Sequence, residues 1–283
     1  MPDETRTGEV LAALLQQRGN QSANNSRDLI EIYVNLIDTY LAMMERTVTG
    51  IILNDPGYIP SVDLSAGLTN DTASRERGMD WPVHAQTMVG VYRLRNIRDC
   101  MMTVLKEAVP GDCIETGVWR GGVCIYTRAI LAAFGVKDRK VWVADSFEGL
   151  PPPDLDKYPM DAGDALHTVA YLAVSLDEVQ ENFRKYGMLD DQVVFLKGFF
   201  GDTLPGAAIE RIAILRLDGD MYGSTMDALE ALYPKLSLGG FCIIDDYSLF
   251  NCARAVHDYR DKHGVTAEII PIDQHAAFWR RAA

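Results

Sequence analysis

Two short, largely apolar runs in this sequence end abruptly in carboxylates. The first run ends at Asp218 and Asp220, and the second ends at Asp245 and Asp246. Short apolar runs are typical of strands buried in a parallel sheet, and the carboxyl ends of such strands face the ligand crevice. Carboxylates gathered in one small volume repel one another unless a metal ion or a shared proton intervenes. We therefore predict a Mg²⁺-type site here.

The aspartates on the first loop are also candidates for a general base. Only Gly219 separates Asp218 from Asp220, and residues i and i+2 of an extended segment point the same way. Either side chain could take a proton from a substrate hydroxyl, and we favour Asp218. The plainer alternative is that Asp220 and Asp246 cap helices and that a single aspartate is chemical.

A glycine-containing turn follows the first expected strand, at Glu115, Thr116 and Gly117. A glycine lets the backbone turn closely, so that a ligand can approach the N-terminus of the next helix. The turn has neither the spacing of a dinucleotide-binding motif nor the Lys-Ser/Thr pair of a P-loop. A carboxylate in place of the first glycine suits a cationic or hydroxyl-bearing ligand such as S-adenosylmethionine. The alternative is an ordinary tight turn.

Two further strand ends carry residues suited to an adenosine. Asp145 ends the second expected strand, where an acidic residue commonly accepts both ribose hydroxyls, and Ser146 follows it. After the third strand, Phe199 or Phe200 could pack against the face of the adenine. The alternatives are that Asp145 caps a helix and that both phenylalanines belong to the core.

Tyrosine and histidine side chains near these positions are candidates for substrate contacts. Tyr222 and Tyr247 flank the carboxylates and could line a sugar pocket. His84 lies close to one segment that we expect to be a lid, and His167 lies in the other. The histidines show no metal-ligand spacing, so we assign them no metal role.

Strands and helices alternate from residue 111 onward. The last two strands are separated by only three residues and should pair antiparallel. The whole describes an α/β fold, a doubly wound seven-stranded Rossmann-like sheet with helices on both faces, and resembles the class I methyltransferases. We expect strands at 113–118, 140–147, 193–196, 212–217, 241–244, 268–272 and 276–279, and helices at 122–134, 176–186, 225–236 and 252–263.

The N-terminal segment begins with a polar stretch. Residues 1–25 are expected to form a flexible extension with a short helix at 9–17. A helical pattern then starts at Ser26, a plausible N-cap, and runs to Met44. Its wide apolar face either packs on its own domain or forms the interface of a homo-oligomer.

Two segments rich in turn residues are expected to cover the crevice, because long loops in compact domains are usually functional or disordered. We call residues 54–80 the first lid and residues 151–173 the second lid. Helices are expected from Pro82 to Val91 and over 95–106. The chain is thus divided into the extension at 1–25, N-terminal helices with the first lid at 26–110, and a ligand-binding domain at 111–283.

Composition argues against several classes of protein. The net charge is −13, whereas nucleic-acid binders usually present a basic face. No apolar stretch reaches the ~18 residues that span a membrane, and the acidic N-terminus lacks the apolar core of a secretory signal. The five cysteines have no C-x-x-C spacing. We therefore expect a cytoplasmic, reduced protein without nucleic-acid or membrane partners.

Four motifs carry a resemblance to a known family. They are Glu-Thr-Gly-Val-Trp-Arg-Gly-Gly at 115–122, Val-Trp-Val-Ala-Asp-Ser-Phe at 141–147, Leu-Arg-Leu-Asp-Gly-Asp-Met-Tyr-Gly-Ser-Thr-Met at 215–226 and Gly-Gly-Phe-Cys-Ile-Ile-Asp-Asp-Tyr at 239–247. Together they resemble the macrocin O-methyltransferase family over about residues 44–283. The resemblance implies S-adenosylmethionine, Mg²⁺, and O-methylation of a deoxysugar hydroxyl on a glycosylated natural product, together with homo-oligomerisation.

The resemblance also assigns roles to residues. It implies that the metal ligands are Asp218, Asp245 and Asp246 and that the base is Asp218 or Asp220. The cofactor would be surrounded by Thr87, Met88, Glu115, Thr116, Gly117, Asp145, Ser146, Gly198, Phe199 and Phe200. The two lids would decide which sugar and which aglycone fit.

Two alternatives remain beside this reading. One is a catechol-type O-methyltransferase, which uses the same metal chemistry on an aromatic diol. The other is a non-enzymatic adenosine-ligand sensor, in which converging carboxylates have no evident purpose.

Overall fold

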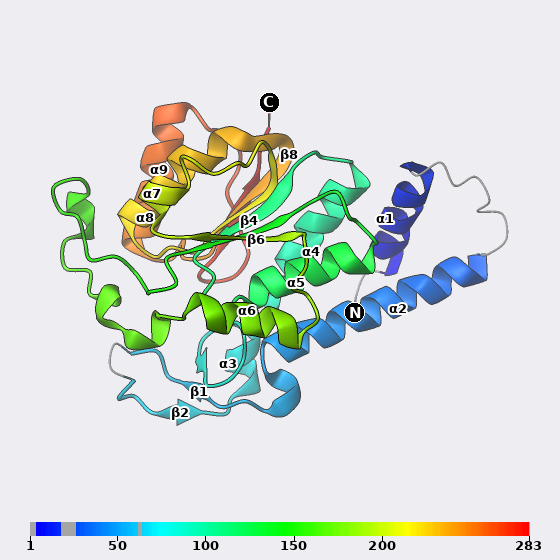
Figure 1. The fold of residues 1–283 in the computed structure, drawn as a ribbon, viewed down its shortest axis with the longest axis horizontal. Coiled ribbons are helices and arrows are strands. Elements are labelled where there is room, and N and C mark those ends of the chain that lie inside the picture. The colour runs from blue at the N-terminus through cyan, green and yellow to red at the C-terminus, as the bar shows by residue number, and fades with distance from the viewer. Residues whose placement is uncertain (1–3, 18–26, 62–63, 283) are drawn as a thin grey trace.

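The apolar runs of the sequence form the centre of the fold. The computed structural model describes residues 4–17, 27–61 and 64–282 and places these runs in one seven-stranded sheet of order β6-β5-β4-β7-β8-β10-β9 (Figure 1). Strands β4 to β8 are parallel, and β10 is antiparallel to both of its neighbours. The predicted class I methyltransferase arrangement is therefore confirmed. The strands are β4 (Asp112–Thr116), β5 (Val141–Asp145), β6 (Val193–Lys197), β7 (Ile212–Leu217), β8 (Leu236–Ile244), β9 (Ile270–Pro271) and β10 (Ala277–Arg280).

Helices cover both faces of this sheet, because alternate side chains of its strands point to opposite sides. On β4, Cys113 belongs to one buried cluster and Ile114 to the other. The first cluster lies under α4 (Gly90–Lys106), α5 (Gly122–Ala133) and α6 (Leu176–Lys185), and the second under α7 (Phe200–Thr203), α8 (Tyr222–Leu232) and α9 (Phe250–His263). A 3₁₀ turn, η6 (Tyr233–Lys235), leads from α8 into β8.

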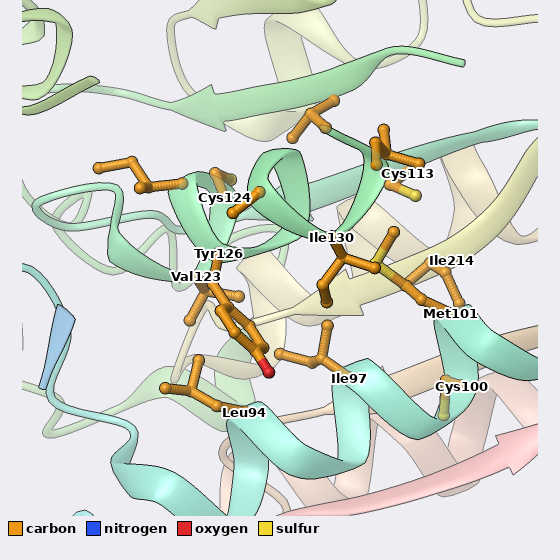
Figure 2. Close-up of a cluster of buried hydrophobic side chains, with 14 of the residues drawn as sticks. Leu94, Ile97, Cys100, Met101, Cys113, Val123, Cys124, Tyr126, Ile130 and Ile214 are labelled. Atoms are coloured by element: carbon orange, nitrogen blue, oxygen red, sulfur yellow. The ribbon is translucent and has the colours of Figure 1, made fainter. Parts of the chain in front are cut away.

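The contact between α4 and α5 shows how the first cluster is held together (Figure 2). Leu94, Ile97 and Met101 recur at helical spacing on α4 and meet Tyr126 and Ile130 of α5, and all five side chains are almost completely buried. Burying one such side chain contributes roughly 1.5–3 kcal/mol. This packing fixes α4, which reaches the site described below.

Two helices precede this core, α1 (Glu4–Gln17) and α2 (Arg27–Val48). A flexible extension with a short helix at 9–17 was expected at residues 1–25. The helix found there, α1, is longer and starts at Glu4, and its Val10 is fully buried. The hydroxyl of Thr7 donates to Asp38 of α2 at 2.6 Å, and Asp38 also pairs with Arg98 of α4. Ser26, the expected N-cap, lies outside the described residues, as do residues 1–3 and 18–25.

The first lid is ordered by a buried ion pair and a small sheet of order β2-β1-β3. Arg75 donates to both carboxylate oxygens of Asp80 at 2.7 Å, and both side chains are buried. The elements within this lid are β1 (Gly57–Tyr58), β2 (Leu68–Thr69) and α3 (Thr72–Glu76). The 3₁₀ turn η2 (Ile51–Leu53) directly precedes the lid, and β3 (Trp81–Pro82) directly follows it.

The helix predicted from Pro82 to Val91 was wrong. Pro82 lies in β3, whose Trp81 pairs with Tyr58 of β1, and the next helix, α4, begins only at Gly90. Gly90 has φ +75°, and a Cβ there would lie 2.3 Å from the nitrogen of Gly78. Only a glycine fits where the chain passes so close to Gly78, and α4 begins at this residue.

The second lid contains three short 3₁₀ turns, η3 (Pro159–Asp161), η4 (Leu166–Thr168) and η5 (Ala170–Leu172). Within the ranges that the structure describes, no helix has the length and apolar character needed to cross a membrane.

Candidate active site

The carboxyl ends of β4, β5, β7 and β8 open into a cavity of about 840 Å³. Both lids border it. Ile59 and Met79 line it from the first lid, and Asp161 and Leu166 line it from the second. The two segments that the sequence identified as lids thus lie against the crevice.

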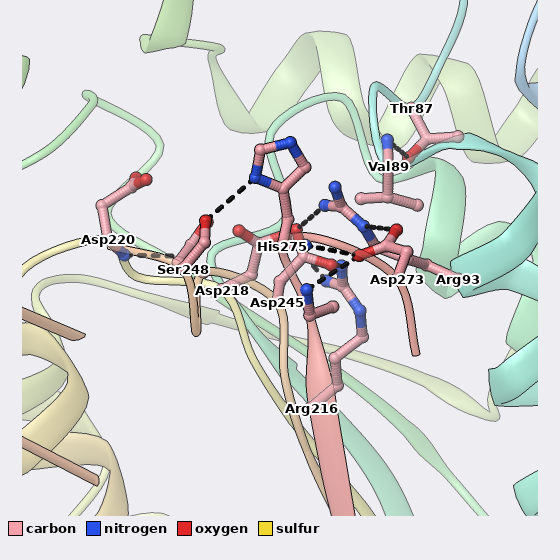
Figure 3. Close-up of polar contacts among 12 residues, drawn as sticks. Thr87, Val89, Arg93, Arg216, Asp218, Asp220, Asp245, Ser248, Asp273 and His275 are labelled. Carbon is pink, nitrogen blue, oxygen red and sulfur yellow. Dashed lines mark hydrogen bonds and ion pairs between the residues drawn. The ribbon is translucent and has the colours of Figure 1, made fainter. Parts of the chain in front are cut away.

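The pairing of β7 with β8 brings the aspartates together. These strands are parallel with Leu217 opposite Ile244, so the residues that follow them are neighbours. Asp218, Asp245 and Asp246 each offer an oxygen, and these oxygens lie within 4.8 Å of one another. The backbone N–H of Asp220 donates to Asp246 at 3.0 Å, which fixes the fourth aspartate beside them (Figure 3).

Crowding changes the proton affinity of this cluster. Burial, followed by the charge of Asp245, raises the pKa of Asp218 well above its usual range. Burial and the charge of Asp220 do the same to the pKa of Asp246. Burial and the charge of Asp218 raise the pKa of Asp220 to about 8. The cluster therefore binds protons tightly unless another positive charge is present.

Two arginines supply part of that positive charge. Arg216 of β7 donates to Asp218 at 2.8 Å and also pairs with Asp245 and Glu115. Arg93 of α4 pairs with the other oxygen of Asp245 and with Asp273 (Figure 3). Neither arginine was singled out from the sequence, because nothing in their spacing indicates that they converge.

The cluster fits a divalent cation. Its donors are hard carboxylate oxygens, which Mg²⁺ prefers, and they come from adjacent strand ends that hold them close. Asp218 and Asp246 are only partly buried and line the cavity, so a cation bound there would face a substrate.

The turn after β4 meets β7 closely. Gly117 has φ +83°, and a Cβ there would lie 1.6 Å from the carbonyl oxygen of Asp218, so glycine is required. Glu115 lines the cavity but is 4% exposed and bound to Arg216 and Cys124. Burial, opposed by Arg216, raises the pKa of Glu115 to about 7. The Glu115 carboxylate is thus mainly engaged in holding Arg216 and the walls of the site in place.

Asp145 lies where a nucleoside sugar was predicted and is also held by the backbone. Its two oxygens accept N–H groups of Val118 and Phe147, each at 2.7 Å. Burial raises its pKa. Asp145 and Ser146 still line the cavity. Acceptor oxygens at this place fit a hydroxyl-bearing, cationic ligand such as S-adenosylmethionine.

The other predicted cofactor residues mostly lie on the same cavity. Phe199, which is 38% exposed, and Phe200 line it beside Asp145, and Thr87 and Met88 line it from the segment before α4. Thr116 and Gly198 are not on the lining, although both adjoin residues that are.

The three predicted substrate residues do not line the cavity. The hydroxyl of Tyr222 meets Asp258 at 3.1 Å, and that of Tyr247 lies 2.9 Å from the imidazole of His257. His167 is exposed in η4. Their side chains point to the α9 side or to solvent, which sequence position alone does not reveal.

His275 lines the cavity and was not predicted. Its Nδ1 lies 2.9 Å from the hydroxyl of Ser248 (Figure 3). Its Nε2 lies 3.1 Å from the sulfur of Met79 in the first lid. Asp273 accepts its backbone N–H at 2.8 Å, so the ring is positioned by the Arg93–Asp273 pair. No motif marked this histidine.

The second lid is tied to the loop that carries the aspartates. Asp161 accepts the N–H groups of Tyr222 and Gly223 at 2.8 Å each, at the start of α8. Tyr171 meets Tyr58 of the first lid with ring centroids 5.8 Å apart, and it stacks on Trp81, directly after that lid, at 5.2 Å. The lids therefore contact each other as well as the loop that carries the aspartates.

This sheet order, with helices on both faces and one reversed strand, is the fold of the class I methyltransferases. The calicheamicin methyltransferase CalS11 shares the fold, with a TM-score of 0.56, 20% identity and coverage of 84% of this chain and 91% of that one.

The chain belongs to the macrocin O-methyltransferase (TylF) family, whose model matches residues 39–281. It is 50% identical to mycinamicin III 3″-O-methyltransferase of Micromonospora griseorubida over 87% of this chain and 98% of that protein. It is 48% identical to demethyldecarbamoylnovobiocin O-methyltransferase of Streptomyces niveus over 86% and 93%. The structure of the O-methyltransferase NovP matches with a TM-score of 0.83 and 47% identity, covering 87% of this chain and all of that one. The protein is therefore an O-methyltransferase, which removes the sensor alternative.

We predict that the metal-free protein loses stability as pH rises. The pKa of Asp220, about 8, exceeds the ~3.9 of an unfolded aspartate, so its contribution to stability is fully present below about pH 4 and is lost progressively as pH rises to about 8. The Tm in EDTA should fall between about pH 5 and pH 8 and level off at higher pH, and Asp220→Asn should flatten the slope. The exposed Asp156→Asn is the control, and equal slopes in all three proteins would contradict the prediction.

Proposed function

We propose that this enzyme transfers a methyl group from S-adenosylmethionine to a sugar hydroxyl of a glycosylated natural product, with Mg²⁺ bound by Asp218, Asp245 and Asp246. The observation that carries the proposal is the convergence of these three carboxylates on the floor of a large cavity. Names of relatives support the acceptor class, since one places its methyl group at the 3″ oxygen of mycinamicin III and another on demethyldecarbamoylnovobiocin.

The cavity wall also supports a polyhydroxylated acceptor. Asp154, Asp202 and Asp227 line it in addition to the aspartates of the cluster, and carboxylates accept hydrogen bonds from sugar hydroxyls. Apolar lid residues such as Ile59 and Leu166 line it as well and suit an aglycone. A small catechol would leave much of this volume unfilled.

In this mechanism the residues of the chain position the cofactor and the acceptor, take the proton from the acceptor hydroxyl, and exclude water. Phe199 and Phe200 would pack on the adenine, and Asp145 with Ser146 would hold the ribose. A bound divalent cation supplies positive charge that makes a neighbouring hydroxyl more acidic. Asp218 would then take the hydroxyl proton, and fixed alignment of acceptor and methyl group contributes ~7–11 kcal/mol to lowering the barrier. The joined lids would exclude water.

We predict that methyl transfer requires a divalent ion. Without it, the three carboxylates repel one another and the acceptor hydroxyl keeps its low acidity. Product mass should be measured with a panel of desmethyl glycosides and catechols, in excess EDTA and after Mg²⁺ is added back. Undiminished turnover in EDTA would refute the metal role. Turnover of catechols but of no glycoside would show that the acceptor is an aromatic diol and not a sugar.

We predict that Asp145→Asn weakens cofactor binding far more than Asp246→Asn does. Charge-assisted hydrogen bonds to the ribose are worth roughly 1.5–3 kcal/mol, or about 10- to 150-fold in affinity. Calorimetry with S-adenosylhomocysteine in metal-free buffer measures this difference. Equal losses in the two variants would count against a ribose contact at Asp145.

We predict that Asp218 is both a metal ligand and the base. Arg216 already holds one of its oxygens at 2.8 Å and directs the carboxylate into the cluster. Asp218→Asn should therefore lose both Mg²⁺ affinity and kcat. If Asp220→Asn instead lowers kcat by ~100-fold or more with metal affinity intact, the scale of a general base, then Asp220 is the base.

We predict that α2 forms the interface of a homo-oligomer. Ile32, Tyr33, Leu36 and Met43 are each more than half exposed on this helix, and clustered exposed apolar residues mark interaction sites. Leu36→Asp should shift the species seen by light scattering at micromolar concentration to a monomer. Leu238→Asp is the matched control, because Leu238 is equally exposed at 60%. A monomeric wild-type protein would disprove the interface.

A further inference from the structure

Arg216 lies directly beneath the carboxylate cluster and is itself 2% exposed. Its Nη1 donates to Asp218 at 2.8 Å and its Nη2 donates to Asp245 (Figure 3). The same Nη1 also donates to Glu115. One guanidinium therefore contacts two of the three proposed metal ligands and a further buried carboxylate.

The other nearby cation cannot take over this task. Arg93 pairs with Asp245 and divides its charge with Asp273, and neither hydrogen bond nor ion pair links it to Asp218 among the described residues. Arg216 is thus the cation that joins the ends of β7 and β8. An arginine is always charged in a protein, so it provides this charge at every pH at which the protein is folded.

We propose that Arg216 is an internal counter-ion that keeps the cluster assembled when no metal is bound and that weakens metal binding, so that the ion can exchange. This inference rests on the proposed Mg²⁺ site. The guanidinium and the metal ion neutralise the same carboxylates, and two cations at one cluster repel each other. Arg216 therefore acts on the metal through its charge, which opposes that of the ion.

Charge and hydrogen-bond geometry make different predictions here. If the positive charge of the side chain is what matters, Arg216→Lys keeps that charge beside the carboxylates, and Mg²⁺ affinity should stay within about fivefold of the wild-type value. If the fork of hydrogen bonds that aims Asp218 and Asp245 is what matters, lysine cannot reproduce it, and Mg²⁺ should bind much more weakly.

The main test compares Arg216→Met with Arg98→Met at pH 8. Arg98 is the matched control, because it is also buried and paired with two carboxylates, Asp38 and Glu45, but these belong to α2 and not to the cluster. Breaking a buried pair should lower the Tm in EDTA on the order of 10 °C in both variants. Saturating Mg²⁺ should raise the Tm of Arg216→Met by more than it raises that of the wild type, and so restore much of the loss. In Arg98→Met the rise in Tm with Mg²⁺ should equal that of the wild type.

Calorimetric titration with Mg²⁺ gives the second readout. Arg216→Met should bind the ion roughly tenfold more tightly or better, because a repelling charge has been removed. Equal or weaker binding, or a Mg²⁺ shift no larger than that of the wild type, would overturn the inference. If Arg216→Met is insoluble in both buffers, Arg216→Lys decides: affinity within fivefold supports the counter-ion, and a larger loss overturns it. A wild-type protein without any Mg²⁺ response would contradict the proposed metal site itself, and this inference with it.

Discussion

Repulsion among carboxylates at the ends of two paired strands is the constraint on which this site depends. The parallel register that sets Leu217 opposite Ile244 places Asp218 beside Asp245. The protein offsets the repulsion with groups from the neighbouring strand residues and from one distant helix. Arg216 comes from the strand itself, Arg93 comes from α4, and the N–H of Asp220 reaches Asp246. Because Arg93 lies on α4, the packing of α4 against α5 also holds this positive charge at the cluster.

The same constraint extends to the cofactor side and to the C-terminus. Gly117 is required because the turn after β4 touches the carbonyl of Asp218, so the predicted cofactor turn and the carboxylate loop share one contact. Arg93 links Asp245 to Asp273, whose other oxygen fixes the backbone before the reversed strand β10. The antiparallel hairpin that closes the sheet therefore also positions His275 in the cavity. A change at any of these places alters the whole arrangement rather than one contact.

The sequence predicted the sheet and the carboxylate cluster because both follow from local patterns. A buried parallel strand must be apolar throughout, and the residues after it must lie at the same edge of the sheet. The helix expected from Pro82 failed because the pairing of Trp81 with Tyr58 and its stacking on Tyr171 are long-range contacts. The N-terminal extension was underestimated for a similar reason: α1 is ordered by contacts such as that between Thr7 and Asp38, which no local pattern reveals.

Side-chain direction marks the boundary of what could be predicted within the site. Tyr222 was chosen for its position beside the carboxylates, but it begins α8, and helical geometry turns its hydroxyl to Asp258 on α9. His275 was passed over because it lies in a short turn without periodicity. The predicted cofactor residues lie mostly at strand ends, so they could be read from the sheet pattern. The lids are instead held by tertiary contacts, such as those of Asp161 and Tyr171, which no local pattern reveals. Under the proposed function, lid substitutions would therefore change acceptor preference and leave the sheet and the carboxylates as they are.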